Sequence, residues 1–136
     1  MYSVHMCQSE VHNGGFLQLF WNNTGIIVPE AIEGYRTIGM PEVASLVEQA
    51  AKYLGVPYPL NRDDRWDALL VASDKSEEEL ETIFKSEDNF YIAFVKATSG
   101  LPFDDLNRKF WSTIRTESGG FEEAATRYTQ KISLSK

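Results

Sequence analysis

The feature that most constrains the fold of this chain is a pair of adjacent glycines, Gly14 and Gly15, inside an otherwise helical pattern. Glycine loses more conformational freedom on folding than any other residue, so this pair indicates a turn whose backbone shape other residues adopt only with difficulty. Residues 2–12 predict a first helix that ends at Asn13 and Gly14 in a left-handed cap. The residues that follow predict a short second helix with one buried face, formed by Phe16, Leu17, Phe20 and Trp21.

The rest of the chain alternates between helical apolar spacing and breaks at glycine or proline. Pro29 and Pro41 stand where first-turn prolines belong, and Gly39 and Gly55 end the two helices that these prolines begin. Residues 56–61, with two prolines, predict an irregular loop between two halves of the bundle. This spacing predicts two successive helices over residues 29–55.

Capping signals mark the later helices. Asn61 or Asp63 is expected to begin one helix, and Ser76 with Glu79 forms the capping box of another, which residues 86–89 divide from the next. A further helix follows the boundary at residues 100–102, with Leu106, Phe110, Trp111 and Ile114 as its apolar positions, and the last runs from about Phe121. No segment alternates with period two between hairpin turns, so the predicted fold class is all-α. We expect residues 1–136 to form a single domain, a bundle of about six to eight short helices.

Composition narrows the class of protein further. The single cysteine, Cys7, excludes an intramolecular disulfide and fits a reducing compartment. No apolar run approaches the roughly 20 residues that span a bilayer, and residues 1–10 lack the pattern of a signal peptide. We therefore expect a soluble, cytoplasmic protein with no membrane partner.

Charge is distributed unevenly along the chain, whose net charge is −7. Residues 1–105 carry 17 acidic and 7 basic residues, whereas residues 106–136 carry 3 acidic and 6 basic ones. This negative excess disfavours direct nucleic-acid binding. The densest acidic stretch, residues 77–88, predicts a face that binds a basic protein, and its candidate binding residues are Glu77, Glu78, Glu81, Glu87 and Asp88. The competing interpretation is a solvated helix face whose acids complement the helix dipole.

Residues that carry catalytic chemistry form no recognised constellation. His5 and His12 are seven residues apart, about 10 Å along a helix, which is too far to share a metal ion. Cys7 is expected to be a small buried side chain rather than a nucleophile. Glu30 and Glu33 are better explained as first-turn acids than as paired carboxylates or cation ligands. We therefore predict no catalytic residues, no metal site and no cofactor.

Residues 10–39 form a thirty-residue stretch of asparagines, glycines and aromatic residues, with Asn13, Gly14, Gly15 and Phe16 near its start and Asn22 and Gly25 at its middle. This stretch resembles the signature of the DNA-mimic protein family, most of whose members are catalogued only as carrying a domain of unknown function. The pattern is moderately specific and fades after residue 54, and further matches lie at Gln18, Glu30, Ala31, Ile32, Ile38 and Ala44. The matched residues that we expect to shape the fold are Glu10, Asn13, Gly14, Gly15, Phe16, Phe20, Asn22, Gly25 and Gly39.

The resemblance implies an all-α domain, often dimeric, whose founding member displays acids in a DNA-like arrangement and sequesters a transcription factor from its operator. No catalytic activity comes with it. The first functional hypothesis is thus a non-enzymatic acidic domain that binds a DNA-binding protein, with a homodimer as a possible assembly. An immunity-type protein that neutralises a toxin is a related alternative. The other class is a small enzyme or ligand-binding domain with a pocket near Asn13–Glu33, where Asn22, Asn23 and Glu30 would converge.

Overall fold

Glycine and proline stand at most of the helix boundaries, as the sequence predicts. The computed structural model describes residues 1–134, in which eight α-helices and two short 3-10 helices occur and no strand does. The predicted domain range of 1–136 therefore includes two positions outside the described residues. In chain order the elements are α1 (Tyr2–Trp21), η1 (Asn23–Ile27), α2 (Val28–Thr37), α3 (Pro41–Lys52), α4 (Arg62–Ala72), α5 (Glu77–Ser86), α6 (Phe90–Ala97), α7 (Phe103–Thr116), η2 (Glu117–Gly119) and α8 (Phe121–Leu134). The all-α, single-domain prediction is confirmed.

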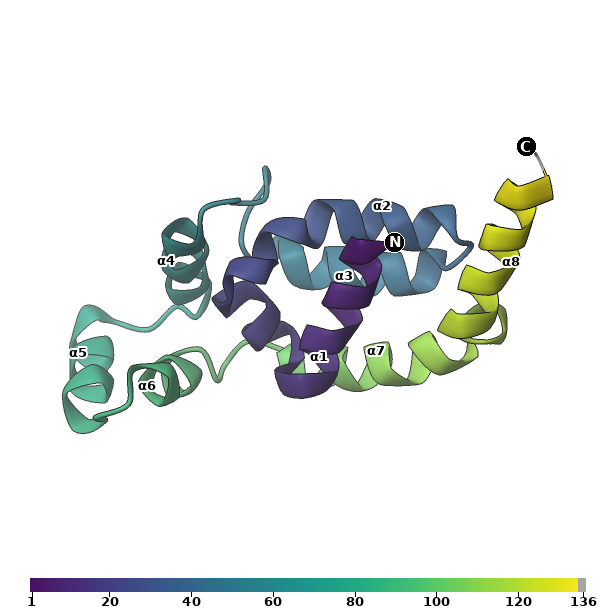
Figure 1. The fold of residues 1–136 in the computed structure, drawn as a ribbon. Helices are drawn as coiled ribbons and strands as arrows, with labels where there is room; N and C mark the ends of the chain where they lie inside the picture. The colour runs from purple at the N-terminus through teal and green to yellow at the C-terminus, as the bar shows by residue number, and fades with distance from the viewer. Residues whose placement is uncertain (135–136) are drawn as a thin grey trace.

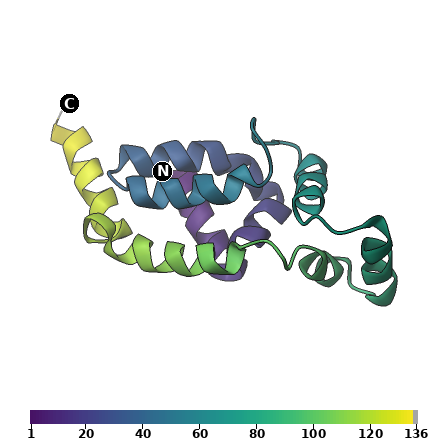
Figure 2. The same cartoon turned by 180° about the vertical axis from the view of Figure 1, so that it is seen from behind.

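Helices α1, α2, α3 and α7 form the body of the molecule (Figures 1 and 2). Helices α2 and α3 are the two helices predicted over residues 29–55, and they pack side by side as a hairpin with prolines in their first turns and Gly39 at φ 85° between them. Helices α1 and α7 cover this hairpin. The body's core contains mainly aliphatic and aromatic side chains that are fully buried, among them Val4, Phe16, Phe20, Tyr35, Val43, Val47 and Phe110.

Helix α1 is kinked at the glycine pair, so it consists of two helical segments, as predicted. The left-handed residue is Gly15, at φ 77° and ψ −175°, whereas Gly14 has an extended φ of −148°. The expected left-handed cap at Asn13 and Gly14 therefore lies one residue later. Phe16 and Phe20 on the second segment are fully buried, as expected for its apolar face.

We call residues 62–97, which contain α4, α5 and α6, the arm. The arm lies at one end of the molecule, and α8 projects at the opposite end (Figure 1). Helix α5 packs against α6 and contains no buried residue. The predicted cap of α4 is confirmed, since the Asn61 side chain accepts hydrogen bonds from the backbone N–H groups of Asp63 and Asp64.

Two local expectations needed correction. Ser76 caps α5 by accepting a hydrogen bond from the Glu79 N–H, but its hydroxyl also donates to the Glu79 carboxylate, so the reciprocal bond to the Ser76 backbone is not formed. Trp111, expected on the inner face of α7, is 38% exposed. Its neighbours Phe110 and Ile114 occupy the buried stripe of that helix, and Trp111 lies beside that stripe.

Candidate acidic interface

The acid of the N-terminal motif, Glu10, ties the two segments of α1 to each other and to η1. Its carboxylate accepts hydrogen bonds from the Gln18 amide at 3.1 Å and the Asn22 amide at 2.9 Å, with the Thr24 hydroxyl at 3.4 Å. A carboxylate is an acceptor with two oxygens, so it can take all three donors at once. The predicted structural role of Glu10 and Asn22 is supported by these contacts.

The two glycines of the motif are explained by what a side chain would strike. A Cβ at Gly14 would overlap the Gln18 side chain, which folds over it to reach Glu10. A Cβ at Gly15 would overlap the amide of Asn107, whose oxygen accepts a hydrogen bond from the Phe16 N–H at 2.8 Å. Asn107 thus satisfies a backbone donor that the kink removes from the helical ladder.

The remaining motif residues differ in how closely other atoms surround them. A Cβ at Gly25 would lie 2.7 Å from Nε of Arg65, so glycine makes room for the guanidinium. Gly39 has a positive φ and open space around it, which fits its place after α2. Asn13 is exposed and lies just before the kink.

The acids predicted to form a binding face lie on α5 and the loop after it, at the outer end of the arm. Glu77, Glu78 and Asp88 are exposed and have no ion-pair partner among the described residues, and Glu81 pairs only with Lys85 on its own helix, at 2.6 Å. Glu87 differs. Its side chain is 22% exposed, and the hydrogen bond from Lys96 at 2.7 Å lowers the pKa of its carboxyl below the usual range.

Four further acids on the same arm were not singled out by the sequence. They are Asp63, Asp64 and Asp67 of α4 and Asp74, which follows it with a φ of 55°. Together the arm contains ten acidic and five basic residues, a net charge of −5 within a chain of net charge −7. These four acids are visible in the sequence but lie outside the densest acidic stretch, residues 77–88.

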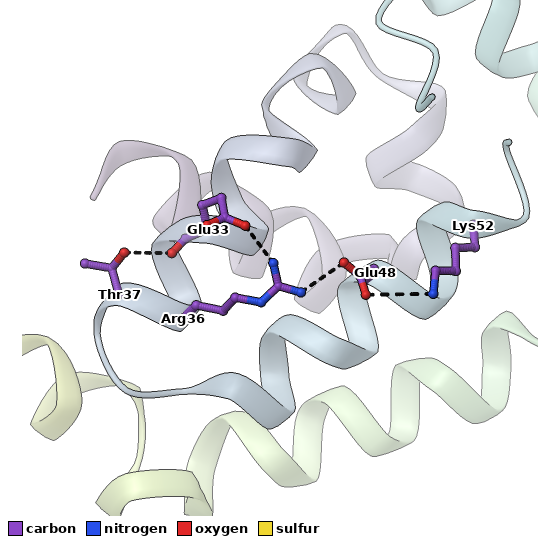
Figure 3. Close-up of polar contacts among 5 residues, drawn as sticks. All are labelled: Glu33, Arg36, Thr37, Glu48 and Lys52. Atoms are coloured by element: carbon purple, nitrogen blue, oxygen red, sulfur yellow. Dashed lines mark hydrogen bonds and ion pairs between the residues drawn. The ribbon is translucent and has the colours of Figure 1, made fainter. Parts of the chain in front are cut away.

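The acids of the body are arranged differently, because basic side chains neutralise several of them. Figure 3 shows Arg36 between two carboxylates, at 2.6 Å from Glu33 and 2.9 Å from Glu48, and Lys52 lies 3.8 Å from the other oxygen of Glu48. The Thr37 hydroxyl donates to the backbone carbonyl of Glu33. The hydrogen bond from Arg36 lowers the pKa of Glu48. This part of the body therefore holds its acids in a charge network with Arg36 and Lys52, whereas Glu77, Glu78 and Asp88 of the arm have no such partner among the described residues.

The alternative pocket near Asn13–Glu33 is not assembled as expected. The Asn22 amide donates to Glu10, Glu30 lies exposed in the first turn of α2, and no described hydrogen bond joins Asn22, Asn23 and Glu30. Two hollows reach this part of the chain: one of about 250 Å³ lies between the kink of α1, α6 and the start of α7, and one of about 700 Å³ includes Asn13. Asn22, Asn23 and Glu30 line neither of them.

The candidate nucleophile and histidines are also accounted for by packing. Cys7 is fully buried, and burial raises the pKa of its thiol to about 12. His5 makes an edge contact with Phe121, and His12 makes one with Phe110. Within residues 1–134, no three histidine, cysteine, aspartate or glutamate side chains are grouped closely enough to hold a metal ion. None of the described helices combines the length and apolar character of a membrane crossing.

Comparison with known proteins gives one informative result. A family model described as DMP19-like protein matches residues 1–131, which is nearly the whole chain and extends well beyond the N-terminal motif. Neither a curated protein nor a solved structure matches the chain significantly. The family match confirms the resemblance drawn from the glycine and asparagine signature, and the chain belongs to the DMP19-like family of DNA-mimic proteins.

Proposed function

We propose that this chain is a non-enzymatic acidic protein-binding domain, a DNA mimic that sequesters a DNA-binding protein such as a transcription factor. One observation carries the proposal. Glu77, Glu78 and Asp88 lie exposed at the outer end of the arm without an ion-pair partner among the described residues, whereas Glu33 and Glu48 of the body are paired with Arg36.

The number of exposed carboxylates on α5 is close to the number of phosphates that a DNA-binding protein contacts on a duplex of the same length. Residues three or four apart on a helix are neighbours, so Glu81 lies beside both Glu77 and Glu78 on one face. Helix α5 has 10 residues and is therefore about 15 Å long, a length over which duplex DNA carries about nine phosphates, about half of them on the side that a protein contacts. Over this length the helix carries four exposed carboxylates, Glu77, Glu78, Glu79 and Glu81, of which Glu81 is paired with Lys85.

The non-enzymatic part of the proposal is supported by the state of the reactive groups. The Cys7 thiol stays protonated at neutral pH because burial raises its pKa to about 12, and a thiol must ionise to act as a nucleophile. The Glu10 carboxylate is occupied by the side chains that it holds in place. Both groups therefore serve the fold.

The test compares three immobilised proteins as baits in extracts of the native host. The first is the wild type, the second carries Glu78→Lys, Glu81→Lys and Asp88→Lys on the arm, and the third carries Glu42→Lys, Asp104→Lys and Glu122→Lys outside it. Both variants change the net charge from −7 to −1, and all six acids are exposed. The third protein thus controls for total charge.

A mimic binds through complementary charge, so its affinity falls as salt screens the interface. We expect a DNA-binding protein to be retained by the wild type and the control variant, to be released as the salt concentration rises, and to be lost by the arm variant. Retention by the arm variant with an unchanged salt dependence contradicts the proposal. Circular dichroism spectra of all three proteins establish that each is folded.

A further inference from the structure

The arm is joined to the body at the C-terminal end of α1, where a helix leaves its last carbonyl groups without intrahelical partners. Arg65 of α4 reaches into this end. Its Nε donates to the Phe20 carbonyl at 2.9 Å, and its Nη2 donates to the Asn22 carbonyl at 2.8 Å. Its Nη1 donates to the Leu60 carbonyl at 2.7 Å, in the loop that leads into the arm. One planar group therefore links α1, the entry loop and α4.

Arg65 is the largest fully buried side chain of the described residues and is 1% exposed. No carboxylate forms an ion pair with it among those residues, so the carbonyl groups and the negative end of the α1 dipole compensate its charge. Burial lowers the pKa of Arg65, but a guanidinium stays charged at neutral pH. A buried charge of this kind is retained only where its hydrogen bonds are satisfied.

Two neighbours of Arg65 complete the joint through a single acceptor. The Trp21 carbonyl accepts hydrogen bonds from Nε of Arg62 at 2.7 Å and from the Trp66 indole at 3.0 Å. The guanidinium of Arg62 lies 4.5 Å from the centroid of the Trp66 ring, which in turn stacks on Trp21 at 4.3 Å. Arg65 is the only one of these side chains that is fully buried, and it contacts two separate backbone segments, the end of α1 and the entry loop.

We propose that Arg65 is a positioning residue: it fixes the direction in which the arm leaves the body, and with it the direction that the acidic α5 faces. The importance of this direction for binding rests on the proposed function, in which the arm is the binding surface. The geometry itself does not depend on a partner. Replacing the guanidinium removes the buried hydrogen bonds that hold α4 to the end of α1 and to the entry loop and leaves the contacts of Arg62 and Trp66 with Trp21, while α5 and α6 remain packed on each other.

The test measures the distance between the arm and the body with two nitroxide labels. Thr82→Cys on α5 and Ser112→Cys on α7 place the labels at exposed positions, and the buried Cys7 remains unlabelled, which mass spectrometry checks. Pulsed electron resonance then gives the distribution of label distances for the full chain. The test variant is Arg65→Met, and the control is Val47→Ala, which leaves a cavity in α3 far from the joint.

We expect one narrow distance distribution for the labelled wild type and for Val47→Ala, even though the control lowers the melting temperature. Arg65→Met should give a distribution about twice as wide, because an arm without this link samples more directions. An unchanged width in a folded Arg65→Met protein overturns the proposal. Should this variant fail to fold, the width measured for Arg65→Lys tests the proposal in the same way, because an ammonium lacks the planar fork of donors that bridges the same three carbonyls.

The result is independent of the binding experiment. A distribution that stays narrow rejects Arg65 as the positioning residue and leaves the acidic face as the proposed binding surface. A binding experiment that fails while the Arg65→Met distribution widens rejects the proposed function and keeps the joint.

Discussion

Replacing Glu10 by alanine tests whether the family motif is a scaffold. The substitution removes a carboxylate that accepts from the Gln18 and Asn22 amides, and from Thr24 at a marginal 3.4 Å. A hydrogen bond to a charged group contributes about 1.5–3 kcal/mol to the free energy of unfolding. Because these donors are only partly buried, we expect the loss of two such bonds to lower that free energy by about 2–4 kcal/mol. For a domain of this size, that corresponds to a fall of about 6–15 °C in melting temperature.

The assay is urea unfolding followed by tryptophan fluorescence and circular dichroism, with Glu10→Gln and Glu33→Ala as companions. Glu10→Gln keeps one acceptor oxygen and should fall between wild type and Glu10→Ala. Glu33→Ala removes a side chain that is 72% exposed and pairs only with Arg36, so its effect should stay within about 0.5 kcal/mol. The scaffold role is refuted if Glu10→Ala unfolds within about 0.5 kcal/mol of the wild type.

Three other predictions follow from single contacts. Gly15→Ala should destabilise the protein by about 1–3 kcal/mol, since φ is 77° and the new Cβ meets Asn107, whereas Gly100→Ala, with open space and no positive φ, should be nearly neutral in the same urea assay. Cys7 should not react with a thiol reagent at pH 8 in the folded protein. Because burial raises its pKa from 9.0 to about 12, its stabilising contribution is complete below pH 9 and is lost by about 1.4 kcal/mol per pH unit between pH 9 and 12, measurable as a falling free energy of unfolding. Glu117→Ala should cost about 1–2 kcal/mol, because its carboxylate accepts from the first-turn N–H groups of α3 at residues 42 and 43, at 2.7 and 2.9 Å; equal melting temperatures for this variant and wild type would contradict that role.

The helices were predictable because their boundaries carry local signals. Prolines in the first turns of α2 and α3, the caps at Asn61 and Ser76 and the glycines after α2 and α3 each act within a few residues. The position of the left-handed residue was misplaced by one because Gly14 and Gly15 both permit it. What separates them is Asn107, 91 positions from the Phe16 amide that it accepts from, and no local pattern identifies such a contact.

The joint of the arm was missed for the same reason. Arg65 is preceded by Arg62 and several acids, and this pattern is typical of an exposed helix surface. Its burial follows from the carbonyl groups at the end of α1, some 45 positions earlier. The acidic face was found because charge density is visible in the sequence, while the pairing of Glu87 with Lys96 required the packing of α6 beside α5.

Competition with DNA shows whether the acidic arm occupies the DNA-binding surface of the partner. The partner captured by the wild type is bound to a fluorescently labelled DNA fragment that it recognises, and the release of this DNA is followed by anisotropy as each protein is added. We expect the wild type and the variant carrying Glu42→Lys, Asp104→Lys and Glu122→Lys to release the DNA at similar concentrations. The variant carrying Glu78→Lys, Glu81→Lys and Asp88→Lys should release it only at concentrations at least about tenfold higher. Equal release by the arm variant, or binding of partner and DNA together, would contradict the acidic arm as a mimic of DNA.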